Sequence, residues 1–212
     1  TAVTNIQKGL VSGARLLNLI DTKIEIVEKE NAVNLTGFEN KIEFVNVHFS
    51  HETFKVLKGI NLEVQPGETI AIVGSTGAGK STIINLLNRF YEIDSGEITI
   101  DNQNIKNYKL ESLRKQIAIV LQDVFLFADT IYHNITLHNE AITREDVITA
   151  AKKIGVHDFI MSLPEGYDYN VKERGVMLSS GQRQLIAFLR AYVSNPSILI
   201  LDEATSSIDT HS

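Results

Sequence analysis

The apolar residues of this chain follow two different spacings, and the spacing changes near residue 37. Four residues in the first part recur at helical intervals: Ile6, Leu10, Leu17 and Ile20. This pattern predicts an amphipathic helix, and we expect its apolar stripe to pack on its own domain. The stretch that follows, as far as Gly37, is polar with little to bury, and its composition is typical of a linker.

From Lys41 onward the pattern is that of β-strands. Alternate apolar residues from 42 to 49 predict a half-buried strand, with a slip at Val45 that indicates a bulge. Residues 60–64 repeat this period and end at a turn, Pro66-Gly67. Residues 69–73 are apolar on both faces, so we expect them in the middle of a covered sheet.

The rest of the chain alternates helices with strands. Residues 97–100 and 117–121 are expected to be strands, and Asp101-Asn102 forms a tight turn after the first. Residues 124–177 are mostly helical by pattern, with one helix capped by Thr143, with Asp146 three residues on, and stopped at Gly155. A further helical face follows a glycine-rich segment and consists of Ile83, Leu86, Leu87 and Phe90. Together these elements predict an α/β nucleotide-binding core with a helical insert.

Composition narrows the class of protein. With 212 residues, 43% of them apolar, the chain suits one large domain or one domain plus an appendage. The net charge of −6 and the lack of a long Lys/Arg run argue against a nucleic-acid-binding surface, so no nucleic-acid partner is expected. No stretch is apolar for long enough to span a bilayer, so we expect these residues to be water-soluble, and the first residues lack the pattern of a secretory signal.

The metal-binding side chains give a second limit. The chain has no cysteine, which excludes disulfides and thiolate metal sites. None of its six histidines stands at metal-ligand spacing beside carboxylates. We expect them to be ordinary surface or turn residues, apart from His51.

The glycine-rich segment carries the first candidate chemistry. It has the spacing G-x-x-x-x-G-K-[ST] between an expected buried strand and a helix, which is the context of a phosphate-binding loop. Glycines let main-chain N–H groups turn toward a phosphate, the lysine reaches the β- and γ-phosphates, and the hydroxyl that follows it is suited to Mg²⁺. The residues predicted to bind ATP here are Gly74, Ser75, Thr76, Gly77, Ala78, Gly79, Lys80, Ser81 and Thr82.

Two carboxylates, Asp202 and Glu203, carry the second. They end an apolar run, residues 198–201, and buried carboxylates are costly unless they are paired or bound to a metal. At the carboxyl end of a parallel strand they would face the ligand crevice. Asp202 suits the Mg²⁺ shell, and Glu203 suits a general base that polarises the attacking water. A plain helix N-cap pair is the competing interpretation, which the phosphate loop disfavours.

Five motifs occur in the order found in ATP-binding cassette (ABC) ATPases, and the chain resembles that family from about residue 41 to 212. They resemble the Walker A loop (74–82), the Q-loop (Gln122), the signature (178–182), the Walker B strand (198–203) and the D-loop (206–209). Residues 167–175 are similar to the segment that marks exporter-type members and contacts the coupling helices of a membrane domain. The resemblance implies a P-loop NTPase fold: a RecA-like core with a mixed sheet, an antiparallel β subdomain and a helical subdomain at about 124–180.

The resemblance also implies roles. Lys80, Gln122 and Glu203 would be catalytic, and Ser81, Gln122 and Asp202 would bind Mg²⁺. Asp209 would communicate between two sites in a dimer, because the ATP of one chain would be completed by the signature of a second nucleotide-binding domain. The signature residues that would face the partner's ATP are Leu178, Ser179, Ser180, Gly181 and Gln182.

The same resemblance places the chain in a transporter. Residues 1–37 would follow a transmembrane domain of the same polypeptide, and residues 38–212 would be the nucleotide-binding domain at the cytoplasmic face of the cell membrane. Hydrolysis of ATP would power export of a substrate. Alternatives are a cassette ATPase that acts on DNA or ribosomes, and a non-hydrolysing regulatory cassette of a heterodimer.

Four positions depart from the family pattern. His51 stands where an aromatic ring usually stacks on adenine, which predicts weaker or less selective base binding unless His51 is only an exposed loop residue. Ser180 and Lys172 each replace a glycine, so Ser180 would crowd the partner's nucleotide and Lys172 puts its local backbone in doubt. The switch histidine of the family would lie beyond Ser212, which indicates a C-terminally truncated domain.

Overall fold

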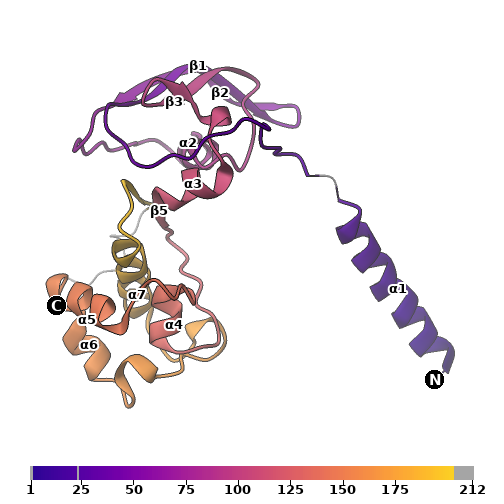
Figure 1. The fold of residues 1–212 in the computed structure, drawn as a ribbon. Helices are drawn as coiled ribbons and strands as arrows, with labels where there is room; N and C mark the ends of the chain where they lie inside the picture. Colours follow the sequence, from indigo (N-terminus) through magenta and orange to yellow (C-terminus); the bar gives the residue numbers. More distant parts are fainter. Residues whose placement is uncertain (1, 23, 203–212) are drawn as a thin grey trace.

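The computed structural model describes residues 2–22 and 24–202, which form an antiparallel sheet, a small parallel sheet and a group of helices (Figure 1). The elements in the first part are α1 (Ala2–Ile20), β1 (Ile42–His51), β2 (Phe54–Val64), α2 (Lys80–Leu87), β3 (Ser95–Ile100), β4 (Gln103–Asn104), the 3-10 turn η1 (Ile105–Asn107), α3 (Leu110–Lys115) and β5 (Ile117–Val120). The second part contains α4 (Ile131–Thr136), α5 (Arg144–Lys153), α6 (His157–Met161), the 3-10 turns η2 (Gly166–Asp168) and η3 (Glu173–Gly175), α7 (Ser180–Val193) and β6 (Ile198–Leu201).

The antiparallel sheet has the order β2-β1-β3-β4. The register of β1 slips between Phe44 and Val47 against β2 and between Val45 and His48 against β3, which confirms the bulge predicted at Val45. Gly96 of β3 lies against this bulge, with φ 94, and a Cβ there would come within 2.3 Å of the main-chain oxygen of Asn46. Asp101 and Asn102 both have positive φ, as a tight turn requires, and this turn joins β3 to β4.

The parallel sheet consists of β5 and β6, paired from Ile117–Ile198 to Val120–Leu201. Its Ile117, Ile119, Ile198 and Ile200 share a hydrophobic core with α2 and the antiparallel sheet. On the other face, Val120 packs with Ala187 and Ala191 of α7. The two-stranded sheet therefore separates α2 from α7, and Figure 1 shows it between the upper sheet and the lower helices.

The helices α4 to α7 enclose a core of their own, whose fully buried members include Leu126, Ile131, Ile160 and Leu189. Thr143 and Asp146 form the capping box of α5, which ends at Lys153 just before Gly155, with φ 77, so that prediction is confirmed. No helix of the described ranges combines the length and the apolarity that a membrane crossing requires.

The expected central strand at 69–73 is wrong for this structure. The segment belongs to neither sheet, and Ile70, Ile72 and Val73 are exposed, Val73 at 87%. A parallel strand is held only by its ladder partners, and within the described residues β5 and β6 pair with each other and not with 69–73. Apolar residues on both faces of a segment predict that other elements pack on both sides of it, but they do not determine that the segment joins a sheet.

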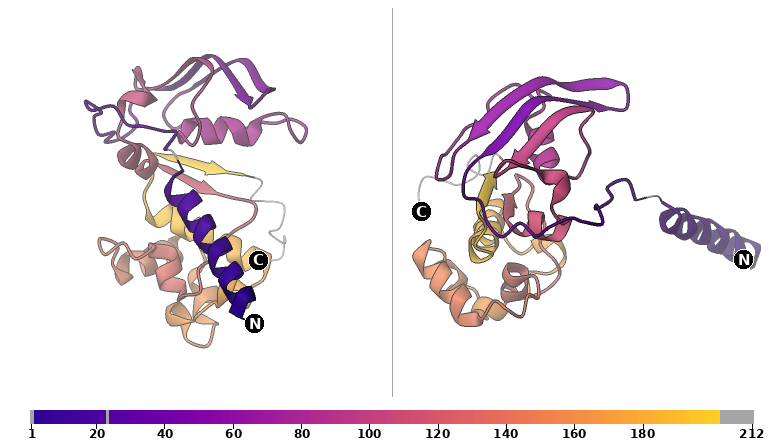
Figure 2. Two further views of the ribbon diagram at one scale, coloured as in Figure 1. Left: turned by 90° about the vertical axis from the view of Figure 1, so that its right-hand side faces the viewer. Right: turned by 45° about the horizontal axis from the view of Figure 1, so that its top comes forward.

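The expected packing of the N-terminal helix is also wrong. Helix α1 points away from the rest of the chain in Figure 1 and in the right-hand view of Figure 2. Its stripe residues Ile6, Leu10, Leu17 and Ile20 are between 60% and 75% exposed. Helical spacing identifies an apolar face but does not identify what packs against it.

The polar stretch before Gly37 buries more than its composition suggests. Leu35 is 5% exposed and belongs to the core of the antiparallel sheet. Val33 exchanges main-chain hydrogen bonds with Asn107 and Lys109. The prediction of little burial is therefore wrong at Leu35, whereas Val33 is hydrogen-bonded to the domain but stays 48% exposed. In helix α2 the expected apolar face holds for Leu86 and Leu87, whereas Phe90 lies beyond the helix and is 46% exposed.

Candidate nucleotide-binding site

The predicted phosphate loop lies at the N-terminus of α2. Gly77 and Gly79 have φ of 82 and 91, in the region that favours glycine, and Gly79 caps the helix without a side chain. The Lys80 ammonium donates to the main-chain oxygens of Gly74 and Ser75, at 2.8 and 3.1 Å. The loop is therefore closed over its own lysine.

Gly79 has a second reason to be glycine. A Cβ at this position would lie 2.7 Å from Cδ2 of Leu57 and 3.2 Å from Cγ1 of Val56, so the loop fits directly against β2. Ser81 and Thr82 follow in the first turn of α2. Ser81 is exposed, which leaves its hydroxyl open to a ligand. Main-chain donors, a helix N-terminus and a lysine together form an anion-binding site.

Gln122 and Asp202 lie at the carboxyl ends of neighbouring strands. Val120 and Leu201 are the last pair of the β5–β6 ladder, and the Asp202 N–H donates to the oxygen of Val120 at 2.9 Å. Gln122 is exposed and Asp202 half-buried. The structure thus brings these two predicted metal ligands to one edge, as parallel pairing requires. Within the described residues no hydrogen bond joins Ser81 to either of them.

His51 ends β1 within a group of aromatic rings. Its ring packs edge-on against Phe49 and Tyr91, with centroids 4.9 and 5.0 Å away, and it pairs across the hairpin with Phe54. Tyr91 was not among the predicted site residues. It is 38% exposed, and an aromatic residue shortly after α2 was the only signal in the sequence that could have found it. Stacking of His51 on a base stays a prediction.

The signature residues form the N-terminus of α7. Leu178 is buried, and Ser179 is the N-cap, whose hydroxyl accepts the N–H of Gln182 while the Gln182 side chain accepts the N–H of Ser179. Ser180 is the first helical residue and, like Ser179, is exposed; Gly181 follows it. The motif therefore presents a capped helix end to solvent, with the positive end of its dipole outward.

The exporter-like segment has an unusual backbone. Lys172 adopts φ 60 and ψ −176, a region that is essentially restricted to glycine. Arg174 and Gly175 also have positive φ, of 54 and 65. Lys172 replaces the glycine of the family pattern, and it does so at a position where a glycine would be unstrained. Glu203 and Asp209, and with them the predicted base and the D-loop, lie outside the described residues.

Comparison with known proteins identifies the class. The family model described as "ABC transporter" matches residues 57–206, so the chain belongs to this family. It has the P-loop NTPase fold of an ABC nucleotide-binding domain, which binds ATP, and the family hydrolyses ATP. The resemblance inferred from the motifs is confirmed.

Its relatives include a flippase and a solved ABC exporter. A lipid A-core flippase of Syntrophus aciditrophicus, described as ATP-dependent, is 44% identical over 211 residues, which cover 99% of this chain and 35% of that protein. A heavy metal tolerance protein of Schizosaccharomyces pombe is 44% identical over 212 residues, all of this chain and 26% of that protein. A solved structure of a bacterial Atm1-family ABC exporter with ATP bound matches with a TM-score of 0.87 and 45% identity, over 97% of this chain and 36% of that one. The chain thus spans about a third or less of the proteins it resembles.

Proposed function

We propose that this chain is the nucleotide-binding domain of an ABC exporter, in which hydrolysis of ATP drives a substrate across a membrane. The observation that carries the proposal is the position of two helix N-termini in one chain. One, on α2, carries the phosphate loop, and the other, on α7, carries the signature without a lysine. Helices α2 and α7 pack on opposite faces of the β5–β6 sheet. This separation of the phosphate loop from the signature supports a site in which the signature comes from a second domain.

The roles follow from this arrangement. Residues 74–82 would hold the phosphates of ATP, with the Lys80 ammonium exchanging its contacts with Gly74 and Ser75 for phosphate oxygens. Ser179 to Gln182 would face the γ-phosphate held by the partner domain. Glu203 would accept a proton from the attacking water.

The residues also fit Mg²⁺. Magnesium prefers a few oxygen ligands and retains several waters. A hydroxyl on Ser81, an amide oxygen on Gln122 and a carboxylate on Asp202 are oxygen donors of that kind, and the last two share one strand edge. The ion would neutralise phosphate charge as it develops, while the protein's own contribution is to position these oxygens.

The partners would be a second nucleotide-binding domain, identical or different, and a transmembrane domain of the same polypeptide. Helix α1 supports the second, because its apolar stripe is uncovered and its C-terminal end leads into the domain through residues 21–41. Residues 167–175 would receive the coupling helices of that membrane domain. The cassette would then lie at the cytoplasmic face of the membrane.

Substitution of the proposed base tests the hydrolytic role. Glu203→Gln in the complete transporter should bind ATP with unchanged affinity but lose about a hundredfold or more of the steady-state ATPase rate. Glu140→Gln, an exposed carboxylate between α4 and α5, is the matched control and should leave the rate unchanged. An unchanged rate in Glu203→Gln would show that Glu203 is not the base.

Dependence on concentration tests the shared site. If the signature acts on the partner's ATP, the ATPase rate per chain of the soluble domain should rise with protein concentration, and Ser179→Ala should lower the maximum rate. A rate per chain that stays constant over the range would argue against sites completed by a second domain.

A further inference from the structure

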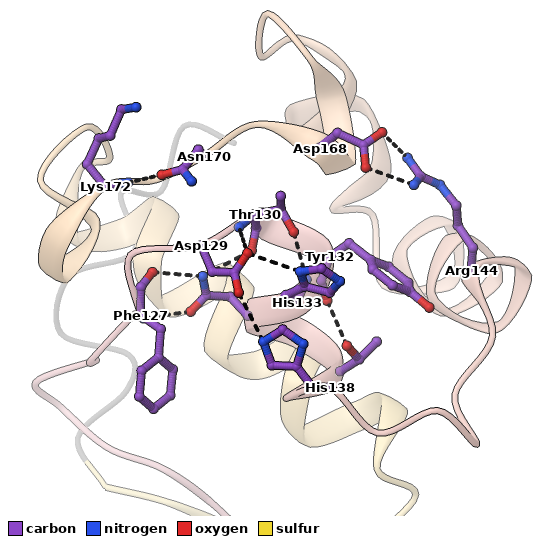
Figure 3. A network of polar contacts seen from close by, with 12 residues as sticks. Phe127, Asp129, Thr130, Tyr132, His133, His138, Arg144, Asp168, Asn170 and Lys172 are labelled. Carbon is purple, nitrogen blue, oxygen red and sulfur yellow. Dashed lines mark hydrogen bonds and ion pairs between the residues drawn. The ribbon is translucent and has the colours of Figure 1, made fainter.

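The structure brings together Asp129 and two histidines that were expected to be ordinary surface or turn residues. Asp129, His133 and His138 direct one carboxylate and two imidazoles toward one point, as Figure 3 shows. Nδ1 of His133 lies 3.0 Å from Oδ1 of Asp129, and Nε2 of His138 lies 3.0 Å from Oδ2. The three ligand atoms all lie within 4.8 Å of one another. The expectation that no histidine stands with a carboxylate at metal-ligand spacing is therefore wrong.

The fold explains how these residues meet. Asp129 directly precedes Thr130, the N-cap of α4, and His133 lies in the first turn, where its N–H donates to the Thr130 hydroxyl. His138 follows Leu137, and both have positive φ, of 58 and 50, so the chain turns back along the helix. This turn brings His138, which follows the short helix, back to Asp129, which precedes it. Spacing along the sequence does not reveal this contact.

Hydrogen bonds hold the main chain around Asp129 in place. The main-chain oxygen of Asp129 accepts from the N–H of Val171, at 3.0 Å. Asn134 is fully buried, and its side chain bonds both the N–H and the oxygen of Phe127, at 2.8 and 3.0 Å. The main-chain oxygen of Asn134 accepts from Nε of Arg190 in α7, at 2.7 Å. A metal site requires ligands whose positions are fixed by their surroundings, and these bonds fix the main chain that carries Asp129 and the start of α4.

The chemistry of the three groups is that of a transition-metal site. The hydrogen bond from the Thr130 N–H, and to a smaller extent the one from His133, hold the pKa of the Asp129 carboxyl below its ordinary value. The carboxylate is therefore ionised at neutral pH. Two imidazoles and one carboxylate suit Zn²⁺ and similar borderline divalent ions, with water in the fourth position. The nearby Arg144 is paired with Asp168, so its charge is compensated.

We propose that Asp129, His133 and His138 form a binding site for a divalent transition-metal ion, Zn²⁺ or an ion of similar preference. Tetrahedral ligation places ligand atoms about 3.3 Å apart, at bond lengths of about 2.0–2.2 Å, so small side-chain rotations are sufficient. The side chains are 30%, 40% and 66% exposed, in chain order, which leaves an entry path from solvent.

Binding needs a change of tautomer and no other covalent chemistry. A neutral imidazole carries one proton, and because an ionised carboxylate only accepts hydrogen bonds, an imidazole bonded to Asp129 must present its N–H to it. On ligation this nitrogen gives its lone pair to the metal, and the proton moves to the other ring nitrogen, Nε2 of His133 and Nδ1 of His138. The ion would then join Asp129, which precedes α4 and is bonded to Val171, to His133 within the helix and to His138 after it.

Titration with Zn²⁺ alone tests the site. The 212-residue chain should bind one equivalent in calorimetry, and Zn²⁺ should raise the unfolding temperature by roughly 5 °C at saturation. Co²⁺ should give visible absorption bands of a low-coordinate nitrogen–oxygen site. His138→Ala removes an exposed ligand and should weaken binding about tenfold or more, since even outer partners of metal ligands are worth that much.

Two further variants keep the test decisive. His48→Ala removes a histidine of β1 that lies outside the cluster and should bind Zn²⁺ as the unaltered chain does. Asp129→Asn retains the size of the side chain and should also lose binding, with the fold checked by circular dichroism. A stoichiometry and affinity that stay the same in His138→Ala and Asp129→Asn, or an unaltered chain that binds no Zn²⁺, would overturn the proposal.

Discussion

Ser179 and Gln182 satisfy each other's main-chain N–H groups at the start of α7. The Ser179 hydroxyl accepts from the Gln182 N–H at 3.2 Å, and the Gln182 amide oxygen accepts from the Ser179 N–H at 2.9 Å. A local capping box thus fixes Ser179 and Gln182 of the signature. The residues between them, Ser180 and Gly181, are left with main-chain N–H groups that no side chain caps and that are available to an anion.

Loss of this cap should be measurable as stability. Ser179→Ala removes the acceptor for Gln182 and should lower the free energy of unfolding by about 1 kcal/mol, the usual value of a serine N-cap. Ser180→Ala is the matched control, because Ser180 is exposed and caps nothing, and it should change stability by less than about 0.5 kcal/mol. Urea unfolding measures both. Equal effects of the two substitutions would contradict the structural role of the cap.

The backbone at Lys172 predicts a stabilising substitution. Its φ of 60 with ψ −176 is costly for a residue with a Cβ, and its N–H is held by the side chain of Asn170 at 2.9 Å. Lys172→Gly should therefore raise the free energy of unfolding, by about 1 kcal/mol after the greater entropy of glycine in the unfolded chain is subtracted.

The control at this position separates strain from charge. Lys172→Ala removes the ammonium but retains the Cβ, so it should leave the free energy of unfolding within about 0.5 kcal/mol of the unaltered chain. Chemical unfolding of the three proteins side by side is sufficient. If alanine stabilises as much as glycine, the effect comes from the lysine side chain and not from the backbone.

Much of the fold could be predicted because local patterns specify it. The bulge near Val45, the turn at Asp101-Asn102 and the capping box at Thr143 depend on nearest neighbours along the chain. The order of the motifs likewise identified the family, and the parallel pairing of β5 with β6 places Gln122 and Asp202 at one edge, as expected.

The failures concern contacts between distant residues. The stripe of α1 and the apolar run 69–73 were read correctly as apolar, but their covering layers depend on partners that the pattern cannot name. The Asp129–His138 cluster was missed because a turn with two positive-φ residues brings its ends together. The covering of an apolar face and the meeting of distant ligands both depend on tertiary structure, whereas periodicity describes only one helix or strand at a time.

The glycines of the phosphate loop should differ in their tolerance. Gly77 and Gly79 both have positive φ, but a Cβ on Gly77 meets nothing within 4 Å, while one on Gly79 meets Leu57 at 2.7 Å. Gly77→Ala should cost about 1–2 kcal/mol of conformational strain. Gly79→Ala should cost about 1–3 kcal/mol more, because the side chain of Leu57 must shift.

Thermal unfolding without nucleotide measures this difference, since ATP contacts then play no part. The variant Gly79→Ala combined with Leu57→Val is the control: the smaller side chain should recover part of the excess cost. Equal costs for Gly77→Ala and Gly79→Ala would show that the contact with β2 does not constrain the loop.

An ion pair between α5 and η2 gives a prediction for pH. The guanidinium of Arg144 donates to both carboxylate oxygens of Asp168, at 2.9 and 2.6 Å, and lies over the rings of Tyr132 and Tyr167. The hydrogen bond from Arg144 lowers the pKa of Asp168 below 3.8 and raises the pKa of Arg144. Because the two side chains are 48% and 58% exposed, solvent screens the pair and it should contribute about 0.5–1 kcal/mol at most.

A depressed carboxyl pKa stabilises the folded chain above the pKa of the unfolded state, near 3.8, and this contribution is lost as the pH falls through the lower folded value. Asp168→Asn should therefore be less stable than the unaltered chain at about pH 6, and the difference should shrink toward zero below about pH 3. Arg144→Ala should show the same loss, whereas Arg144→Lys should retain part of the contribution, because lysine keeps the charge but not the two parallel bonds. Urea unfolding across this range measures each variant. A difference between Asp168→Asn and the unaltered chain that does not vary with pH would mean that the Asp168 carboxylate is not the group that responds.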